Sequence, residues 1–110
     1  MDGEQSGLLQ GTLDLLVLRT LSLAPLHGYG VAQRIEQLTE DAFRIQGGSL
    51  FPALYRLERE GYLRSEWRQT ESGRRAKYYA LTRAGRKKLE EATRSWERAS
   101  LGIRRLLEAT

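Results

Sequence analysis

The sequence of 110 residues predicts one mainly α-helical domain with a small β-hairpin. Two observations support this fold class: apolar residues recur at helical spacing in four segments, and two β-rich segments flank one polar turn. Cysteine is absent, which excludes disulfides and thiolate metal sites. The length suits a single hydrophobic core rather than two.

The first two predicted helices are separated by a glycine-containing turn. The first begins near Leu9 and ends before Pro25, which cannot continue a helix. The second is short, and its apolar face consists of Val31, Ala32, Ile35 and Leu38. In residues 40–48 apolar and polar side chains alternate before two glycines, so we expect a brief extended segment there.

The third predicted helix has Ser49 as its N-cap and ends at Gly61. Its buried stripe is formed by leucines spaced four and three residues apart, at positions 50, 54 and 57. Aromatic and basic side chains and one proline are left on or near the opposite side. These are Phe51, Pro52, Tyr55, Arg56 and Arg59.

Residues 62–69 and 76–82 predict the two strands of a hairpin, since both are rich in aromatic or branched side chains and the polar residues 70–75 separate them. Successive side chains of a strand point to opposite faces. The side chains expected to pack against the helices are Leu63, Trp67, Tyr79 and Leu81. Tyr78 lies on the other face, and its role is open.

Thr82 can cap a final helix that continues almost to the end of the chain. Apolar residues in this helix step by three or four, which is a heptad seam. The seam is longer than internal packing requires, so we expect a homodimer, with residues 1–82 as one domain and 83–110 as a dimerisation helix. The seam residues are Leu89, Ala92, Trp96, Ala99, Ile103 and Leu106.

Positive charge is concentrated in one third of the chain. Residues 56–88 carry eleven cations and four carboxylates, a net charge of +7, whereas residues 1–55 carry three cations and six carboxylates, a net charge of −3. Fifteen of the eighteen cations are arginine, whose planar guanidinium suits bidentate contact with phosphate and guanine. A solvated basic surface is the alternative interpretation.

Helix, helix, extended segment, helix and basic hairpin is the order of a winged helix-turn-helix, which reads the major groove of DNA with its third helix and contacts adjacent DNA with its hairpin. For contact with base edges we expect Ser49, Tyr55 and Arg56. The candidates for phosphate contact are Tyr29, Gln46, Arg74, Arg75, Lys77 and Arg83. Arg74 and Arg75 could also enter a minor groove.

Three stretches, HGYGVAQRIE, GGSLFPALYRLEREGYLRSEW and GRRAKYYALTRAGRKKL, resemble successive motifs of the PadR family of bacterial and archaeal transcriptional regulators. The resemblance covers about residues 9–89. It implies a dimeric winged-helix DNA binder, usually a repressor, of the smaller type with one C-terminal helix. Phe51 departs from the family, which commonly has tyrosine there, so a hydroxyl contact to the DNA backbone would be absent.

The seam position of Trp96 predicts a place in the dimer core. Resemblance to ligand-responsive members of the family suggests an alternative role, in which Trp96 lines a cavity between protomers where a flat hydrophobic effector would stack.

Neither catalysis nor a bound metal or cofactor is expected. The one histidine, His27, lies beside a turn without a nucleophile or carboxylate motif, so we interpret it as a helix cap or surface group. The longest apolar run, residues 15–18, is too short to span a bilayer, and no signal peptide is recognisable, so a cytoplasmic protein is expected. A competing hypothesis is a winged helix that docks an acidic protein partner through its basic hairpin.

Overall fold

A computed structural model describes residues 2–110 of the chain, with side chains from Gly11 onward. Its elements in chain order are α1 (Asp2–Leu23), β1 (Leu26–His27), α2 (Gly28–Leu38), α3 (Gly47–Arg59), β2 (Leu63–Gln69), β3 (Arg75–Leu81) and α4 (Arg83–Glu108). Four helices and one small sheet confirm the predicted fold class. Within residues 2–110, none of the helices is both long and apolar enough to cross a membrane.

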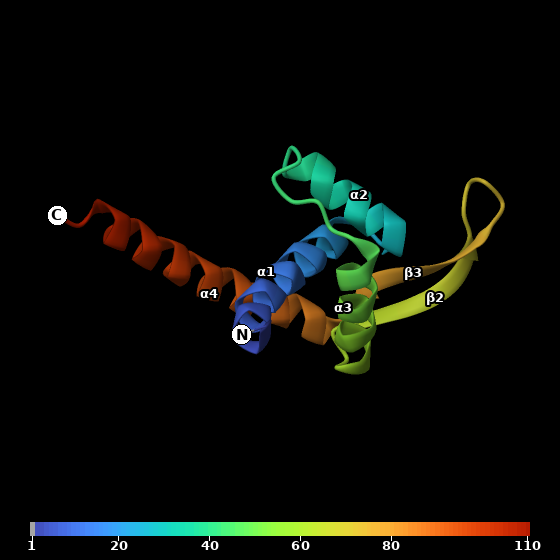
Figure 1. Cartoon of the computed structure of the whole chain (residues 1–110). Coiled ribbons are helices and arrows are strands. Elements are labelled where there is room, and N and C mark those ends of the chain that lie inside the picture. Colours follow the sequence, from blue (N-terminus) through green and yellow to red (C-terminus); the bar gives the residue numbers. More distant parts are fainter. Residues whose placement is uncertain (1) are drawn as a thin grey trace.

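Two elements project from the core in opposite directions (Figure 1). The hairpin of β2 and β3 extends from one side, and the C-terminal half of α4 extends from the other, so that the molecule measures 58 × 28 × 28 Å. We call residues 63–81, the two strands with their connecting turn, the wing. Helices α1, α2 and α3 pack together at the root of both projections.

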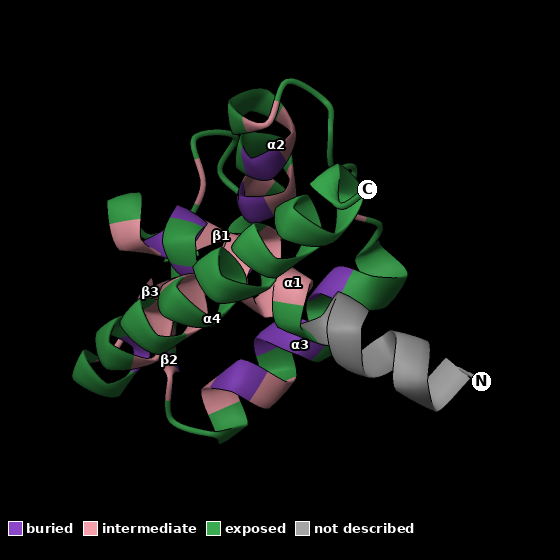
Figure 2. Ribbon diagram, turned by 90° about the vertical axis from the view of Figure 1, so that its left-hand side faces the viewer, coloured by how far each residue is buried: buried purple, intermediate pink, exposed green. Residues whose placement is uncertain are grey.

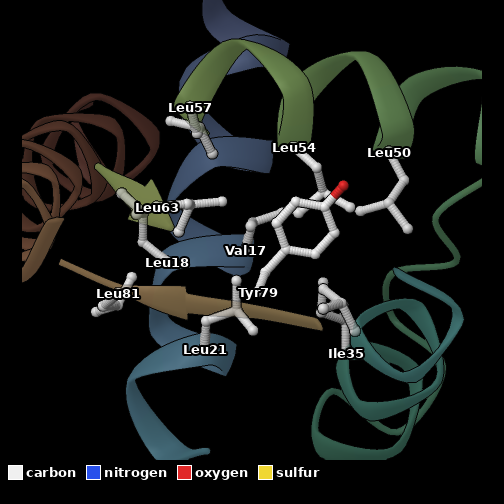
Figure 3. Close-up of a cluster of buried hydrophobic side chains, with 11 residues drawn as sticks. Val17, Leu18, Leu21, Ile35, Leu50, Leu54, Leu57, Leu63, Tyr79 and Leu81 are labelled. Atoms are coloured by element: carbon white, nitrogen blue, oxygen red, sulfur yellow. The ribbon is translucent and has the colours of Figure 1, made fainter. Parts of the chain in front are cut away.

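The core lies between α1, α2, α3 and the inner face of the sheet (Figure 3). The predicted leucine stripe of α3 is confirmed, because Leu50, Leu54 and Leu57 are all buried. Strand β3 contributes Tyr79, which is buried as expected. The expectation for Trp67 is wrong: its side chain is 59% exposed. It pairs with Lys77 in the register, at a level where the hairpin has already extended beyond the core.

The sheet has three strands in the order β1-β3-β2, one more than the predicted hairpin. The additional strand β1 has only two residues and pairs with Tyr78 and Tyr79 of β3. It lies directly before α2, whereas the sequence predicted the extended piece at residues 40–48. There Glu40 and Asp41 instead adopt positive φ angles of 51° and 65° in a turn that follows α2.

Helix α3 begins three residues earlier than predicted. Gln46, rather than Ser49, is its N-cap, and the Gln46 carbonyl accepts hydrogen bonds from the backbone N–H groups of Ser49 and Leu50 at 3.0 and 2.9 Å. The Gln46 side chain itself makes no capping hydrogen bond. The C-terminal prediction is confirmed, because Gly61 follows the helix with a φ of 89°, a conformation that favours glycine.

Thr82 caps α4 as predicted: its hydroxyl accepts a hydrogen bond from the Gly85 N–H at 3.0 Å and donates one to the Gly61 carbonyl at 2.7 Å. Position 85 requires glycine, since a Cβ there would lie 2.1 Å from the Tyr62 carbonyl oxygen. The first turns of α4 then cross α1 (Figure 2). Leu89 packs against the core. Farther along, every residue from position 101 onward is exposed.

Candidate nucleic-acid interface

The exposed side of α3 carries a short stripe of polar and aromatic side chains. Ser49 and Tyr55 are both exposed, as the DNA-facing prediction requires. The guanidinium of Arg59 lies 5.5 Å from the centre of the Tyr55 ring, so the two side chains share one surface. Arg59 was not among the predicted site residues, although its position four residues after Tyr55 puts it on the same face of the helix.

The start of α2 lies against the first turns of α3. The Tyr29 ring is 74% exposed and meets the Phe51 ring edge-on, with centroids 5.5 Å apart. This close approach depends on Gly28, because a Cβ there would lie 2.5 Å from the Phe51 ring. His27 caps α2 as predicted, since its Nδ1 accepts a hydrogen bond from the Gly30 N–H at 3.1 Å. Tyr29 is thereby held beside the N-terminal half of α3.

The turn of the wing places positive charge at one end of the molecule. The Thr70 N–H donates to the Arg74 carbonyl at 2.6 Å, and Gly73, with a φ of 87°, donates back to the Thr70 carbonyl at 2.9 Å. Arg74 and Arg75 follow directly, and both are exposed. The Arg75 guanidinium lies 5.4 Å from the centre of the Trp67 ring, so this exposed indole and cation form one surface on the wing.

On the inner face of the wing, Lys77 is held by an acidic residue of α3. Its Nζ lies 3.0 Å from Oε1 of Glu58, and Oε2 of Glu58 accepts a hydrogen bond from the Ser65 hydroxyl at 2.5 Å. The hydrogen bond from Ser65, followed by Lys77, holds the pKa of Glu58 below its usual range, although partial burial opposes this. The hydrogen bond to Glu58 in turn raises the pKa of Lys77.

Tyr78 connects β1 with the outer face of the wing. Its ring meets the His27 ring edge-on at 5.3 Å, and the Arg68 guanidinium lies 4.5 Å from its centre on β2. The residue whose role was open is therefore a packing residue that ties three strands together.

This combination of fold and basic surface matches a known family. Residues 17–91 fit the family model described as the transcriptional regulator PadR-like family. The chain belongs to the PadR-like family. The family is one of transcriptional regulators, and it accounts for the winged-helix architecture and the predicted DNA-binding class.

Similar proteins span most of this PadR-like regulator. A transcriptional regulator of Mycobacterium tuberculosis is 39% identical over 72 residues, which are 66% of this chain and 64% of that protein. Among solved structures, a transcriptional regulator from Clostridium thermocellum has a TM-score of 0.83 at 27% identity, covering 94% of this chain and 97% of the other. A PadR family transcriptional regulator from Eggerthella lenta has a TM-score of 0.77 at 33% identity, covering 98% and 93%.

In this PadR-like regulator, most of the predicted DNA-contacting side chains are exposed on α2, α3, the wing and the start of α4. These are Tyr29, Gln46, Ser49, Tyr55, Arg74, Arg75 and Arg83. Lys77 is half-buried and paired with Glu58. Among the residues that the structure describes, no group of three or more histidine, aspartate or glutamate side chains could hold a metal ion.

Arg56 does not join the exposed side of α3, contrary to expectation. Its Nη2 lies 2.5 Å from Oδ1 of Asp14 on α1, its Nη1 lies 3.5 Å from Oε1 of Glu60, and its side chain is only 21% exposed. The position directly before Leu57 turns the side chain towards the boundary with α1, where Asp14 compensates its charge. Arg56 thus anchors α3 to α1.

Two grooves flank the crossing of α1 and α4. One has a volume of about 750 Å³ and is lined mainly by apolar side chains of α1, α2 and α4, among them Leu15, Leu16 and Leu38. The other, of about 560 Å³, lies between α1 and α4 and includes Ala92 and Ala99 of the predicted seam. Trp96 lines both grooves.

Proposed function

We propose that this chain is a homodimeric, sequence-specific DNA-binding repressor, in which residues 1–82 read DNA and residues 83–110 pair the two copies. Helix α3 enters the major groove, and the wing holds the adjacent backbone or minor groove. The observation that supports this most directly is the exposed stripe of α3 beside a wing that ends in Arg74 and Arg75, within a PadR-like fold.

The proposed contacts divide into base reading and phosphate binding. Ser49, Tyr55 and the newly identified Arg59 face outward from α3 and are the candidates for base edges. Arg56 supports α3 from behind through Asp14. The phosphate-binding set consists of Tyr29, Gln46, Arg74, Arg75 and Arg83, with Lys77 contributing in part because Glu58 already compensates its charge.

Dimer formation is supported by the apolar surface on α4. The side chains of Leu106 and Leu107 are 75% and 79% exposed, and Trp96, Leu101 and Ile103 are exposed as well. Burial of such surface stabilises an interface by about 25 cal/mol per Å². Because α4 and the wing project in opposite directions, pairing through α4 leaves α3 and the wing of each protomer free to bind DNA. The two half-sites would then lie about 34 Å apart.

Trp96 is also the proposed effector residue. Its position between two grooves supports the binding of a flat hydrophobic compound against the indole. Because Trp96 also belongs to the proposed seam, such binding would alter the pairing of the protomers.

The test is fluorescence anisotropy with a labelled random duplex at low and high salt, followed by footprinting upstream of the protein's own gene. For a DNA-binding protein, the logarithm of the binding constant falls linearly with the logarithm of the salt concentration, because phosphate contacts release counterions. If no salt-sensitive binding occurs at low ionic strength, the hypothesis of a protein-interaction module on an acidic partner is favoured instead.

A further inference from the structure

Glu58 occupies the point where α3 meets both strands of the wing. One oxygen of its carboxylate, Oε1, lies 3.0 Å from Nζ of Lys77 on β3, and the other, Oε2, accepts the hydrogen bond from Ser65 on β2. The side chain is about one quarter exposed, so water competes only partly for these contacts. A single carboxylate of the reading helix therefore holds both strands.

These contacts lie where the hairpin leaves the core, at the outermost residue pairs of the wing that still contact α3. Ser65 pairs with Tyr79, whose ring is buried, whereas Lys77 pairs with the exposed Trp67. In the part of the chain that the structure describes, no side-chain hydrogen bond or ion pair joins residues 66–76 to α3. The attachment at Glu58, together with the pairing of β1 with β3, sets the direction in which the outer wing leaves the core.

We infer that Glu58 is a positioning residue that fixes the wing relative to α3 and thereby favours DNA on which both elements fit at once. This inference rests on the proposed DNA-binding function. A wing held in place loses less conformational entropy when α3 and the wing bind together, which favours the site that suits both. A mobile wing would find phosphates on any sequence.

Glu58 also limits contacts that carry no sequence information. Its charge compensates that of Lys77, whose Nζ lies 3.0 Å from the Glu58 carboxylate. A free lysine there would gain a phosphate contact on every duplex and raise affinity without discrimination. Glu58 thus increases specificity in two ways, by restraining the wing and by occupying Lys77.

The decisive variant is Glu58→Gln, which keeps the size of the side chain and removes its charge. We expect higher affinity for a random duplex, a log–log salt slope steeper by up to about one unit, and a severalfold smaller preference for the operator. The matched control is Glu66→Gln. Glu66 is exposed on the outer face of β2, where it lies 4.0 Å from Arg68, so this variant makes the same charge change without touching α3.

A second readout needs no DNA. The chain has two tryptophans, so in a Trp96→Phe background the fluorescence anisotropy decay of Trp67 reports motion of the wing. We expect faster local motion in Glu58→Gln than in Glu66→Gln. Lys77→Met should free the wing equally but lower affinity for random DNA, which separates loss of positioning from gain of charge.

The inference is overturned if the motion of Trp67 is the same in the Glu58 and Glu66 variants. It is also overturned if Glu58→Gln, like Glu66→Gln, changes the affinities for random duplex and operator by the same factor. Circular dichroism confirms that each variant is folded. If the unaltered protein shows no salt-dependent binding, the proposed function fails, and the Trp67 measurement alone still decides whether Glu58 positions the wing.

Discussion

The wing and the outer half of α4 project from the same core in opposite directions, yet their surfaces differ in kind. The wing carries its exposed residues on strands that are tied to the core by Glu58 and by the stacking of Tyr78. Its tip presents arginine. The outer half of α4 presents leucine and isoleucine along with its charges, and all of its side chains beyond Ser100 are exposed. The cationic projection suits a polyanion, and the apolar projection suits a second copy of the chain.

The largest effect is expected where α4 leaves the core. Gly85→Ala places a Cβ against the Tyr62 carbonyl, so the backbone must shift, and we expect a loss of about 3 kcal/mol or more in the free energy of unfolding. Urea denaturation measures it. The control is Gly102→Ala on the exposed half of α4, where an added Cβ would meet no other part of the molecule within 4 Å apart from its own helix; there alanine should stabilise by about 0.5–1 kcal/mol. Equal effects would mean that the root of α4 is not tightly packed.

The two exposed tryptophans test whether α4 pairs the protomers while the wing does not. Trp96→Glu should raise the dissociation constant of the dimer at least about 30-fold, which corresponds to about 2 kcal/mol, because a charge would enter the seam. Sedimentation velocity would then show monomer. Trp67→Glu makes the same change on the wing and should leave sedimentation unaltered. A dimer of normal affinity in Trp96→Glu would remove α4 as the pairing surface.

Within the DNA-binding surface, substitutions on α3 should change sequence specificity, whereas substitutions on the neighbouring α2 should change affinity for all duplexes. Tyr55→Ala should weaken binding to the operator by about 1–3 kcal/mol and leave random duplex almost unchanged, since base contacts carry the sequence information. Tyr29→Phe removes a proposed phosphate contact and should weaken both duplexes alike. Parallel titrations by anisotropy measure both variants. If Tyr55→Ala also weakened both equally, α3 would not be the base-reading element.

The smallest effect concerns pH and is confined to the root of the wing. Because the pKa of Glu58 is lowered in the folded protein, its contacts stabilise the fold above the unfolded value of about 4.5, and this stabilisation is lost as pH falls through the lower folded value. Between pH 6 and pH 3, the unaltered protein should lose more stability than Glu58→Gln. Thermal melting over this range measures the difference, and identical pH profiles would contradict the ionic attachment.

The parts of the fold that depend on local sequence could be predicted well. The leucine stripe of α3, the Thr82 cap and the stop at Gly61 follow from spacing and capping within a few residues, and all three are confirmed. The start of α3 was misplaced because Ser49 is a good cap by type, whereas Gly47 and Gly48 allow the helix to begin earlier.

The remaining differences depend on contacts between distant parts of the chain. Strand β1 has two residues and takes its partner about fifty residues later, so it leaves no periodic signal. Asp14 and Arg56 are 42 residues apart, and the sequence alone cannot indicate that they pair. The same holds for Glu58 with Lys77. Trp67 has the alternation of a buried residue, but only the length of the hairpin beyond the core decides its exposure.

The most direct test of DNA binding by the wing is the salt dependence of binding to a random duplex, compared between two double variants. Arg74→Ala with Arg75→Ala removes two cations from the wing, and Arg104→Ala with Arg105→Ala removes two from α4. The wing variant should bind more weakly and flatten the log–log slope by up to about one unit per lost contact, whereas the α4 variant should keep the slope. An unchanged slope in the wing variant, or equal flattening in both, would contradict the assignment of DNA binding to the wing.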